Sequence, residues 1–516
     1  MNIYDKFSRE LEGEPFDGYP EYMDYLFACV NSRMDQYLEE MKGLFASGQG
    51  GYKNVLYPDL EIAHTMCQEK IHLFSMEPVR DSEDEESGQE PAAELSDELM
   101  ALLGDYAAEM GTAASGESQS VREPDCEEMM AFIEARAEKT LEAGIALPFY
   151  SLCKKMEFEH FTTFCFACSI LASTQTDYAG VFQVINENGN LPAPTIESAA
   201  RLYYGNEFSI TGAYGDMSVG LEQLQPILDL RVNGSMPFST VVTPDKRIID
   251  FLFGKHPMQL DENYIRFFKM LTDDKELDPI MANQGQLDAM EISYREGVRI
   301  FSFFGDEGSG RKFFIKQFCK KNGMGAISVN CKKLFVYDFT FVEKALWAVT
   351  RECILTNSCC CLDELTFHEE EKDKFLGYMD LAFAKLVSKG LLVYALSKEK
   401  MPMRDITKEE FTELEIPTPT TQEREECWRL FAKDYALGDD IDLLEMATKF
   451  LFTPGKIKAA LANARSLATM NKDILIPRAT LFQGCNNQMS SELTQKATKV
   501  KANFGFEDIV MNRDQR

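Results

Sequence analysis

The chain is 516 residues long, 45% hydrophobic and 27% charged, with a formal net charge of −31 and a pI of about 4.7. This length accommodates about three domains, and the acidity argues against a general affinity for nucleic acid, because phosphate repels a negatively charged surface. No apolar run approaches the roughly 20 residues of a membrane helix, and the N-terminus lacks the basic start and apolar core of a signal peptide.

The fourteen cysteines are scattered rather than spaced as a disulfide framework, which favours a reducing, cytoplasmic environment. Cys359, Cys360 and Cys361 are adjacent in an apolar run, so on a strand they would point to alternate faces. Cys165 and Cys168 have redox-motif spacing, but they lie in an apolar helical stretch. We interpret them as core residues, with metal or redox use as the alternative. None of the five histidines has a second likely metal ligand near it in the sequence, which argues against a zinc site.

Residues 1–76 are predicted to form an N-terminal helical region, because apolar residues recur there at three-to-four spacing. A second helix is expected from Asp59 to Phe74. This region either packs on the rest of the chain or docks a partner. Residues 77–127 are expected to be an acidic flexible linker, since such a composition cannot bury enough surface to fold alone.

Residues 128–257 are predicted to be a mainly helical, winged-helix-like domain. Several helices are expected there, one of them capped by Thr195. A short apolar run at Thr240–Val242 is expected to add a strand. Residues 258–296 are then expected to form a helical connector.

The core module, residues 297–412, is predicted to be α/β. Strands are expected at Arg299–Phe304, Gly325–Val329, Ile354–Leu362 and Leu391–Leu396, with helical segments between them. This alternation implies a doubly wound parallel sheet, and such sheets bind their ligands beyond the carboxyl ends of the strands.

A glycine-rich turn, Gly305-Asp-Glu-Gly-Ser-Gly310, joins the first of these strands to a helical pattern. In a phosphate-binding loop this arrangement points backbone N–H groups and a helix N-terminus at an anion. Such a loop also needs a lysine for the outer phosphates and a hydroxyl for Mg²⁺. Arg311 stands in the lysine position and Lys312 in the hydroxyl position. The sequence therefore predicts a phosphate-binding loop in an ATPase-type domain that has lost, or nearly lost, the ability to hydrolyse ATP.

Two later strand ends carry polar residues that would face the glycine loop. Asp363 and Glu364 follow an apolar run; in a magnesium-dependent ATPase the aspartate holds Mg²⁺ and the glutamate polarises the attacking water. Ser397 ends the next strand, where it would lie beside a γ-phosphate. Arg404 follows in a loop and is considered as an arginine finger, with a solvated surface arginine as the alternative.

Residues 413–475 are predicted to form a small helical lid after a last short strand, Leu414–Ile416. Thr421 is expected to cap the first lid helix. The last lid helix opens at Phe452-Thr-Pro-Gly455, and Lys458 near its start is expected to reach back to the nucleotide.

Four segments in combination resemble an AAA+ ATPase: the glycine loop, Leu362-Asp-Glu-Leu365, Gln422-Glu-Arg-Glu-Glu-Cys-Trp428 and Thr453-Pro-Gly-Lys-Ile-Lys458. The resemblance is greatest to two-module bacterial proteins associated with extracellular contractile injection systems. In that family a winged-helix-like region precedes a degenerate first AAA module and an active second one. The resemblance covers about residues 145–516 and implies an AAA+ type doubly wound parallel sheet with a small helical lid.

The resemblance implies ATP or ADP with Mg²⁺ as the ligand, Asp363 as the metal residue, and Asp363 and Glu364 as a catalytic pair that no longer functions. It assigns nucleotide contacts to Gly305, Gly308, Ser309, Gly310, Arg311, Lys312, Ser397 and Lys458. It also implies a protein client such as a contractile-particle component, and a homo-hexamer for the full-length protein. Neither a membrane nor a nucleic acid is implied as a partner.

Residues 476–516 are expected to be a linker to the start of a second AAA module. The segment Leu493–Lys501 is basic, and Phe504-Gly-Phe-Glu-Asp-Ile-Val510 after it resembles the opening of such a module. The second module itself would follow Arg516 and is missing from this sequence.

Three functions remain as hypotheses. The first is a non-hydrolysing AAA-like scaffold of a protein-remodelling ATPase, with a partner-recognition region before it. The second is a weakly active ATPase in which Arg311 or Lys312 contacts phosphate, since arginine can hold phosphate bidentately. The third is a winged-helix regulator that binds nucleic acid, against which the acidity and the lack of a basic recognition helix argue.

Overall fold

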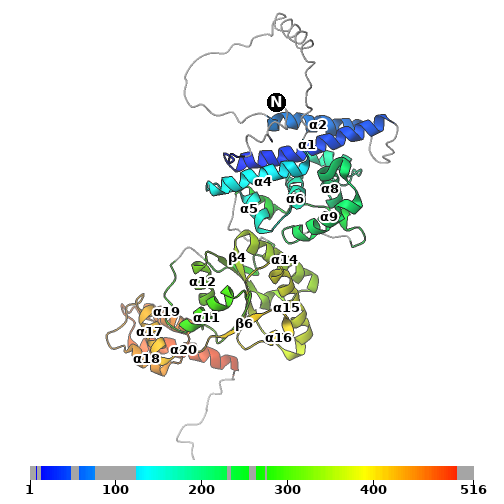
Figure 1. Cartoon of the computed structure of the whole chain (residues 1–516). Helices are drawn as coiled ribbons and strands as arrows, with labels where there is room; N and C mark the ends of the chain where they lie inside the picture. The colour runs from blue at the N-terminus through cyan, green and yellow to red at the C-terminus, as the bar shows by residue number, and fades with distance from the viewer. Residues whose placement is uncertain are drawn as a thin grey trace, which may run out of the picture. The chain divides into compact units, whose positions relative to one another are not determined.

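The structure, a computed structural model, describes residues 7, 13–47, 57–75, 124–228, 230, 234–254, 263–272 and 276–496. The chain forms two compact units, residues 1–255 (unit 1) and 256–516 (unit 2), and each is treated by itself. Both are drawn in Figure 1. None of the helices in the described ranges is long and apolar enough to cross a membrane.

The described residues of unit 1 form helices and the loops that join them. Its α-helices are α1 (Tyr19–Ala46), α2 (Tyr57–Ser75), α4 (Cys126–Glu142), α5 (Pro148–Lys155), α6 (His160–Thr174), α7 (Tyr178–Ile185), α8 (Ile196–Tyr204), α9 (Ile210–Leu224) and α10 (Lys246–Leu252). The described part of the unit also contains 3₁₀ turns at 205–207 and 237–239.

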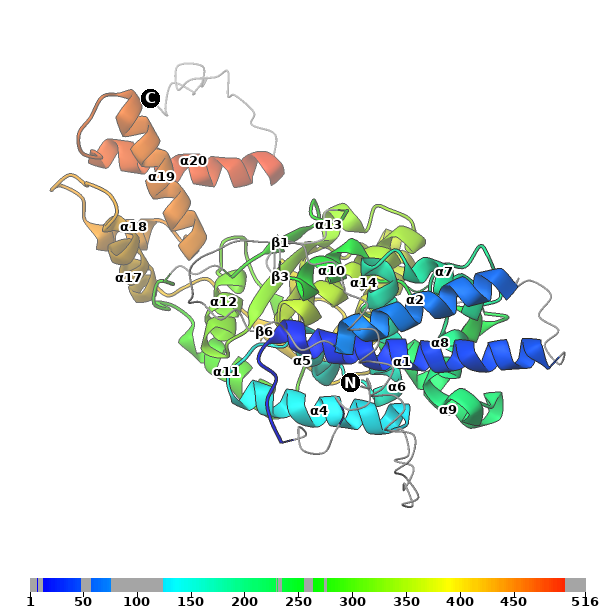
Figure 2. The ribbon, with the colours of Figure 1, turned by 90° about the horizontal axis from the view of Figure 1, so that it is seen from above.

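Helix α6 is the centre of unit 1. It is mostly apolar, and every residue from Phe161 to Leu171 is buried, as expected for a helix surrounded by other helices. Helices α1, α4, α7, α8 and α9 all contact it. Helix α1 also runs beside α2 along much of its length, as Figures 1 and 2 show. Cys165 and Cys168 are buried in α6, which confirms their interpretation as core residues.

Of the larger expectations for unit 1, one is confirmed and two are wrong. Region 1–76 packs on the rest of the chain, the first of its two alternatives, because α1 contacts α4, α6 and α8. It is not a separate domain from region 128–257, since both belong to one compact unit. The winged-helix-like description also fails, since the described part of unit 1 has no strand beyond an isolated bridge between Thr195 and Val241. Thr195 does cap α8, as expected. Of the predicted linker 77–127, residues 77–123 lie outside the described residues. Its last two residues, Cys126 and Glu127, begin helix α4.

Unit 2 is an α/β core with a six-stranded, mostly parallel sheet. Its strands are β1 (Phe268–Met270), β2 (Ile300–Phe304), β3 (Gly325–Asn330), β4 (Ser358–Leu365), β5 (Val393–Ser397) and β6 (Phe411–Glu415). The strand order is β1-β3-β4-β5-β2-β6. Strands β2 to β6 are parallel, while β1 is antiparallel to β3.

Helices cover both faces of this sheet. On one face, α11 (Gln284–Arg295) and α12 (Arg311–Lys321) pack on alternate strand residues such as Phe301, Phe303 and Tyr394. On the other, α14 (Phe339–Leu355) and α15 (Lys372–Val387) contact β3, β4 and β5 (Figure 1). Two short helices, α13 (Cys331–Leu334) and α16 (Met403–Ile406), and a 3₁₀ turn at 369–371 complete the core.

The sequence placed most of these strands correctly but missed details that depend on long-range pairing. The connector 258–296 is not purely helical, because β1 joins the sheet through β3. The strand expected at 354–362 begins only at Ser358, since Ile354 and Leu355 end helix α14. Cys359 and Cys361 face the α11–α12 side of the sheet, so alternation of the cysteines along β4 is confirmed.

The lid is a four-helix cluster at one side of unit 2 (Figure 2). It consists of α17 (Thr421–Ala432), α18 (Leu443–Lys449), α19 (Pro454–Met470) and α20 (Arg478–Lys496). Trp428, Leu461, Leu481 and Cys485 share its core. The predicted boundary at 475 is therefore wrong, because α20 belongs to the lid rather than to a linker. Residues 497–516 lie outside the described residues. The cap of α17 is Thr420, not Thr421, and its side chain accepts from the backbone N–H of Glu423.

Candidate functional site

The glycine loop lies between β2 and α12 and leaves several backbone N–H groups without acceptors. Gly308 and Gly310 have φ values of +75° and +102°, in the left-handed region that glycine favours. The N–H groups of Gly308, Gly310, Arg311 and Lys312 donate to no atom among the described residues. These groups converge at the N-terminus of α12, which is the arrangement that binds an anion.

Ser309 provides a second unsatisfied group in the loop. The residue is only 3% exposed, and its Oγ is buried without a hydrogen-bond partner in the described structure. Ser309 lines the cavity in front of the loop. A buried hydroxyl without a partner is unfavourable unless a ligand or water satisfies it.

This cavity has a volume of about 730 Å³ and lies beyond the carboxyl ends of the parallel strands. It brings together most of the residues that the sequence predicted: Gly308, Ser309, Gly310, Arg311, Lys312, Asp363, Glu364, Ser397 and Lys458. Gly305 does not line it. A Cβ on Gly305 would lie 2.5 Å from the carbonyl oxygen of Ile416, so this glycine permits close packing of the loop against the chain after β6.

Arg311 points across the cavity entrance to the next strand end. Its Nη1 donates a hydrogen bond to the backbone carbonyl of Ser397. Burial lowers the pKa of the Arg311 guanidinium, while the negative charges of Asp363, Glu307 and Asp306 oppose this shift. Arginine has five N–H donors, so one bond to a carbonyl leaves others for a phosphate.

Lys312 forms an ion pair with Asp363, joining the first turn of α12 to the end of β4. Asp363 is 7% exposed, and its Oδ2 also lies 3.4 Å from the hydroxyl of Ser328 on β3. The ammonium of Lys312 thus contacts the carboxylate that would hold a metal. Mg²⁺ does not fit this arrangement, because it would have to displace or closely approach a like charge.

Glu364 follows Asp363 at an irregular point of the sheet. The pairing of β4 with β5 shifts register between Leu362 and Leu365, and Glu364 has a φ of +54°. Its side chain is exposed and lines the cavity. Within the described ranges, no group of three metal-ligating side chains comes together there or elsewhere.

Ser397 and Lys458 line the cavity, but each makes a contact that the sequence did not predict. The Ser397 hydroxyl donates to the backbone carbonyl of Glu399 at 2.7 Å. The Lys458 ammonium lies 2.8 Å from Asp278 and 4.3 Å from the centre of the Phe431 ring. Lys458 is therefore anchored beside the cavity.

The lid is attached to the glycine loop directly. The Thr453 hydroxyl donates to the carbonyl of Glu307 at 2.8 Å, and the Gly455 N–H donates to the carbonyl of Gly308 at 2.9 Å. In the sequence, Thr453 to Gly455 marked the start of a lid helix and part of the AAA+ resemblance, but not this contact with the loop. No local motif marks Asp278, Lys332 and Lys398, which also line the cavity.

Arg404, considered as an arginine finger, does not line this cavity. It lies on α16 and lines a separate hollow with Asp380 and Phe383. Within this chain it therefore does not reach the glycine loop.

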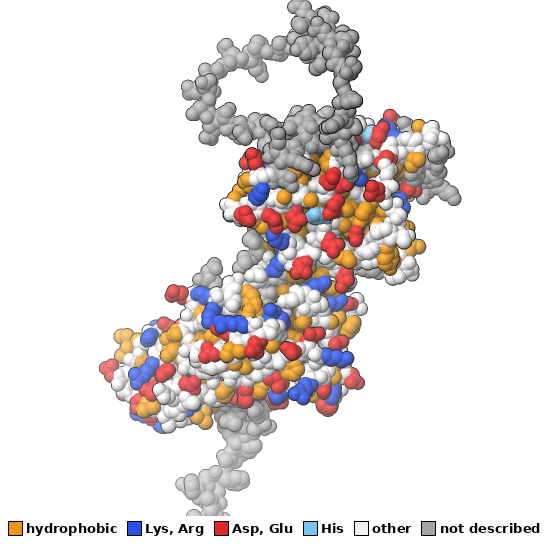
Figure 3. Space-filling model, in the orientation of Figure 1, with side chains coloured by type: hydrophobic (Ala, Val, Ile, Leu, Met, Phe, Trp, Pro, Cys, Tyr) orange, Lys and Arg blue, Asp and Glu red, His pale blue; other side chains and the backbone are white. Residues whose placement is uncertain are grey.

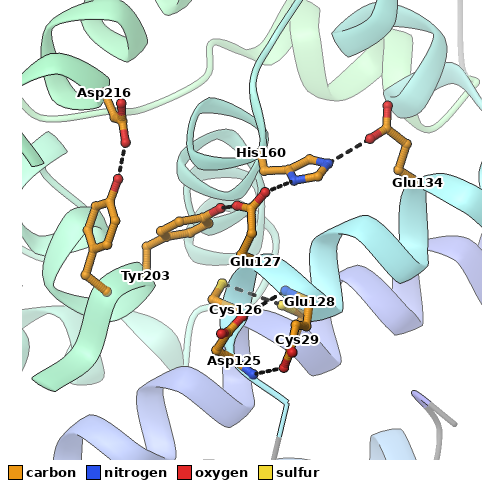
Figure 4. A network of polar contacts seen from close by, with 10 residues as sticks. Cys29, Asp125, Cys126, Glu127, Glu128, Glu134, His160, Tyr203 and Asp216 are labelled. Atoms are coloured by element: carbon orange, nitrogen blue, oxygen red, sulfur yellow. Dashed lines mark hydrogen bonds and ion pairs between the residues drawn. The ribbon is translucent and has the colours of Figure 1, made fainter. Parts of the chain in front are cut away.

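Unit 1 contains a second cavity, also of about 730 Å³. Figure 4 shows its polar network, in which the His160 ring lies between two carboxylates of α4. Nδ1 is 2.7 Å from Glu127 and Nε2 is 2.7 Å from Glu134. The Tyr203 hydroxyl also donates to Glu127. Sequence spacing could not reveal this cluster, because α6 supplies the histidine and α4 the carboxylates.

The comparisons with known proteins do not extend this picture. No protein-family model matches the chain, and no curated protein sequence is significantly similar to it.

Proposed function

We propose that unit 2 is a degenerate AAA+-like module that binds ATP or ADP without hydrolysing it, and that unit 1 recognises a protein client. The observation that carries this proposal is that the glycine loop and Asp363 line one cavity, with Arg311 and Lys312 between them. The whole would form part of a protein-remodelling ATPase linked to a contractile injection system. That last link follows from the sequence resemblance alone.

The sheet topology supports the AAA+ interpretation. Strand β2, which precedes the glycine loop, lies between β5 and β6, while β4, which ends in Asp363, lies on the far side of β5. The strand ending in Ser397 thus separates the loop strand from the Asp363 strand, as expected for an AAA+ core. A helical lid that contacts the loop through Thr453 and Gly455 agrees with the same fold.

The cavity has the chemistry of a nucleotide site. Five lysines and arginines line it (Arg311, Lys312, Lys332, Lys398 and Lys458), against four carboxylates (Asp278, Glu307, Asp363 and Glu364), in a chain whose net charge is −31. The free N–H groups of the loop and the Ser309 hydroxyl would donate hydrogen bonds to phosphate oxygens. Ile280, Met281 and Phe431 also line the cavity and offer apolar surface to a nucleobase.

The side chains argue against hydrolysis. A phosphoryl-transfer site stabilises the developing charge with a lysine and a metal ion. Here the arginine in the lysine position bonds to a backbone carbonyl, and the lysine in the hydroxyl position pairs with the metal aspartate. A titration with a fluorescent ATP analogue, combined with a phosphate-release assay, tests the proposal. We expect saturable binding and no release above the protein-free background.

A weakly active ATPase is the second candidate, and Glu364 favours it. This carboxylate lines the cavity, is exposed, and makes no hydrogen bond or ion pair in the described structure, so it is free to polarise a water. Phosphate release that Glu364→Gln abolishes, with binding retained, would replace the first function by this one.

Unit 1 suits a basic protein partner. Residues 1–255 contain 17 lysines and arginines but 44 aspartates and glutamates, so this unit carries most of the net charge. On the face drawn in Figure 3, acidic side chains predominate on unit 1, whereas both signs are interspersed over unit 2. Such a surface attracts a positively charged client and repels nucleic acid. The acidity of unit 1 argues against the winged-helix regulator. A homo-hexamer remains part of the proposal.

A further inference from the structure

The ion pair between Lys312 and Asp363 has a consequence for the ligand of the glycine-loop cavity. In a magnesium-dependent site the hydroxyl after the lysine and the strand-end aspartate together hold the ion that bridges the phosphates. Here Lys312 replaces the hydroxyl, and its ammonium contacts the aspartate itself. One side chain thus removes a metal ligand and places a positive charge near the metal position.

The position of Lys312 also allows its ammonium to meet a phosphate. Its backbone N–H is one of the free donors at the start of α12, so the residue is already part of the anion cradle. The side chain is 45% exposed, on the cavity side of its pair with Asp363. An ammonium has three donors, and the pair with one carboxylate oxygen leaves others free.

We propose that Lys312 replaces the divalent cation, so that the cavity binds a nucleoside di- or triphosphate without Mg²⁺. This inference rests on the proposed nucleotide-binding function and adds the ionic form of the ligand. The phosphates are held by the loop N–H groups, the Ser309 hydroxyl, Arg311 and Lys312. Mg²⁺ bound to the nucleotide does not raise the affinity, because Asp363, the carboxylate that would contact the ion, is already paired with Lys312.

The test is a titration of the full chain with a fluorescent ATP analogue, once with excess Mg²⁺ and once with excess EDTA. We expect dissociation constants that agree within about twofold. In Lys312→Ser, which restores a hydroxyl and frees Asp363, we expect binding in EDTA to weaken about tenfold or more, the size of a lost charge-assisted contact. Mg²⁺ should then recover part of this loss.

Lys316→Ser is the matched control, because Lys316 lies one turn further along α12 and does not line the cavity. It should bind like the unaltered chain under both conditions. Inorganic tripolyphosphate, offered as a competitor, distinguishes a nucleotide from a bare phosphate chain. We expect it to compete at least tenfold more weakly than ATP; equal competition would overturn the assignment to a nucleoside phosphate.

The outcomes separate this inference from the function on which it rests. Binding that Mg²⁺ strengthens tenfold or more in the unaltered chain would overturn metal-independent binding and leave the nucleotide-binding function standing. Lack of binding under both conditions, with a folded protein by circular dichroism, would overturn both. Equal loss in Lys312→Ser and Lys316→Ser would contradict the role of Lys312.

Discussion

The ammonium of Lys312 pairs with the carboxylate of Asp363, so the first turn of α12 is tied to the end of β4 across the glycine-loop cavity. In Lys312→Met the Asp363 carboxylate, 7% exposed, would keep the Ser328 hydroxyl 3.4 Å away and the nearby charge of Arg311. We expect the free energy of unfolding of unit 2 to fall by about 1–2 kcal/mol. An unpaired buried charge costs more than this, but solvent screens a half-exposed lysine.

Urea denaturation followed by tryptophan fluorescence measures this change, because both tryptophans, Trp347 and Trp428, lie in unit 2. Lys316→Met, outside the cavity, is the control and should lose less than about 0.5 kcal/mol, as most surface substitutions do. A Lys312→Met variant as stable as the unaltered chain would show that the pair contributes nothing.

Gly308→Ala tests the contact between the glycine loop and the lid. A Cβ there would lie 2.7 Å from the Thr453 hydroxyl oxygen and 3.1 Å from the Gly455 Cα, at a φ of +75°. Gly323 is a matched control, because its φ is +64° but no atom lies within 4 Å of its Cβ position. We expect Gly323→Ala to lower the free energy of unfolding by about 1 kcal/mol and Gly308→Ala by about 2–4 kcal/mol, since only the second adds a clash to the backbone strain.

The same urea titrations measure both glycine variants. If the two lost equal stability, the lid would not be packed on the loop as described. A loss confined to nucleotide binding would indicate that the loop and lid separate without cost to the fold.

The His160 cluster predicts a pH dependence in unit 1. Burial lowers the pKa of His160, but the hydrogen bonds and charges of Glu134 and Glu127 outweigh this, so the pKa is raised above its ordinary value. A pKa raised on folding gives stabilisation that is complete below the unfolded value of about 6.5 and is lost as the pH rises through the folded value. His160→Gln should therefore lower the free energy of unfolding at a pH below about 6.5. It should have little effect at a pH well above the pKa of His160 in the folded protein.

We expect His160→Gln to lower the free energy of unfolding by about 1 kcal/mol or less, because Glu127 and Glu134 are both about half exposed and solvent screens their charges. Unfolding followed by circular dichroism at several pH values measures it, and the NMR titration of the His160 ring reports its pKa directly. A titration of His160 below its ordinary pKa would contradict the charged pairing.

The extended lid predicts that α20 stabilises the cluster around Trp428. Leu481 is fully buried in that cluster, whereas Leu475, just before α20, is 46% exposed. We expect Leu481→Ala to lower the stability of the lid by about 2–4 kcal/mol and Leu475→Ala by less than about 1 kcal/mol. The fluorescence of Trp428 follows the unfolding. Equal effects of the two variants would favour the linker that the sequence suggested.

Local sequence patterns were sufficient to predict those elements whose structure depends mainly on their own residues. Apolar runs marked the parallel strands β2, β3 and β5, and the glycines before α12 marked the loop, because period, turn chemistry and capping act over a few residues. The placement of Asp363 at a strand end followed in the same way. With these strands parallel, their carboxyl ends meet at one edge, so the shared cavity was predictable as well.

Pairings between distant segments decided the rest. The short strand β1 is stabilised by β3, and α20 joins the lid because its Leu481 and Cys485 are buried in a core that it shares with α19. Neither has a strong pattern of its own, so the sequence suggested a connector and a linker. The merging of regions 1–76 and 128–257 into one helical unit likewise depends on α6, whose mostly apolar surface is buried by neighbouring helices.

The chemistry of the site divides in the same way. Arg311 and Lys312 showed from the chain alone that a lysine and a hydroxyl were replaced. Only the folded structure shows which groups these side chains contact. Arg311 donates to the backbone carbonyl of Ser397, and Lys312 pairs with the carboxylate of Asp363. A side chain's partner depends on which strand ends lie within its reach, and that distance is set by the order of strands in the sheet.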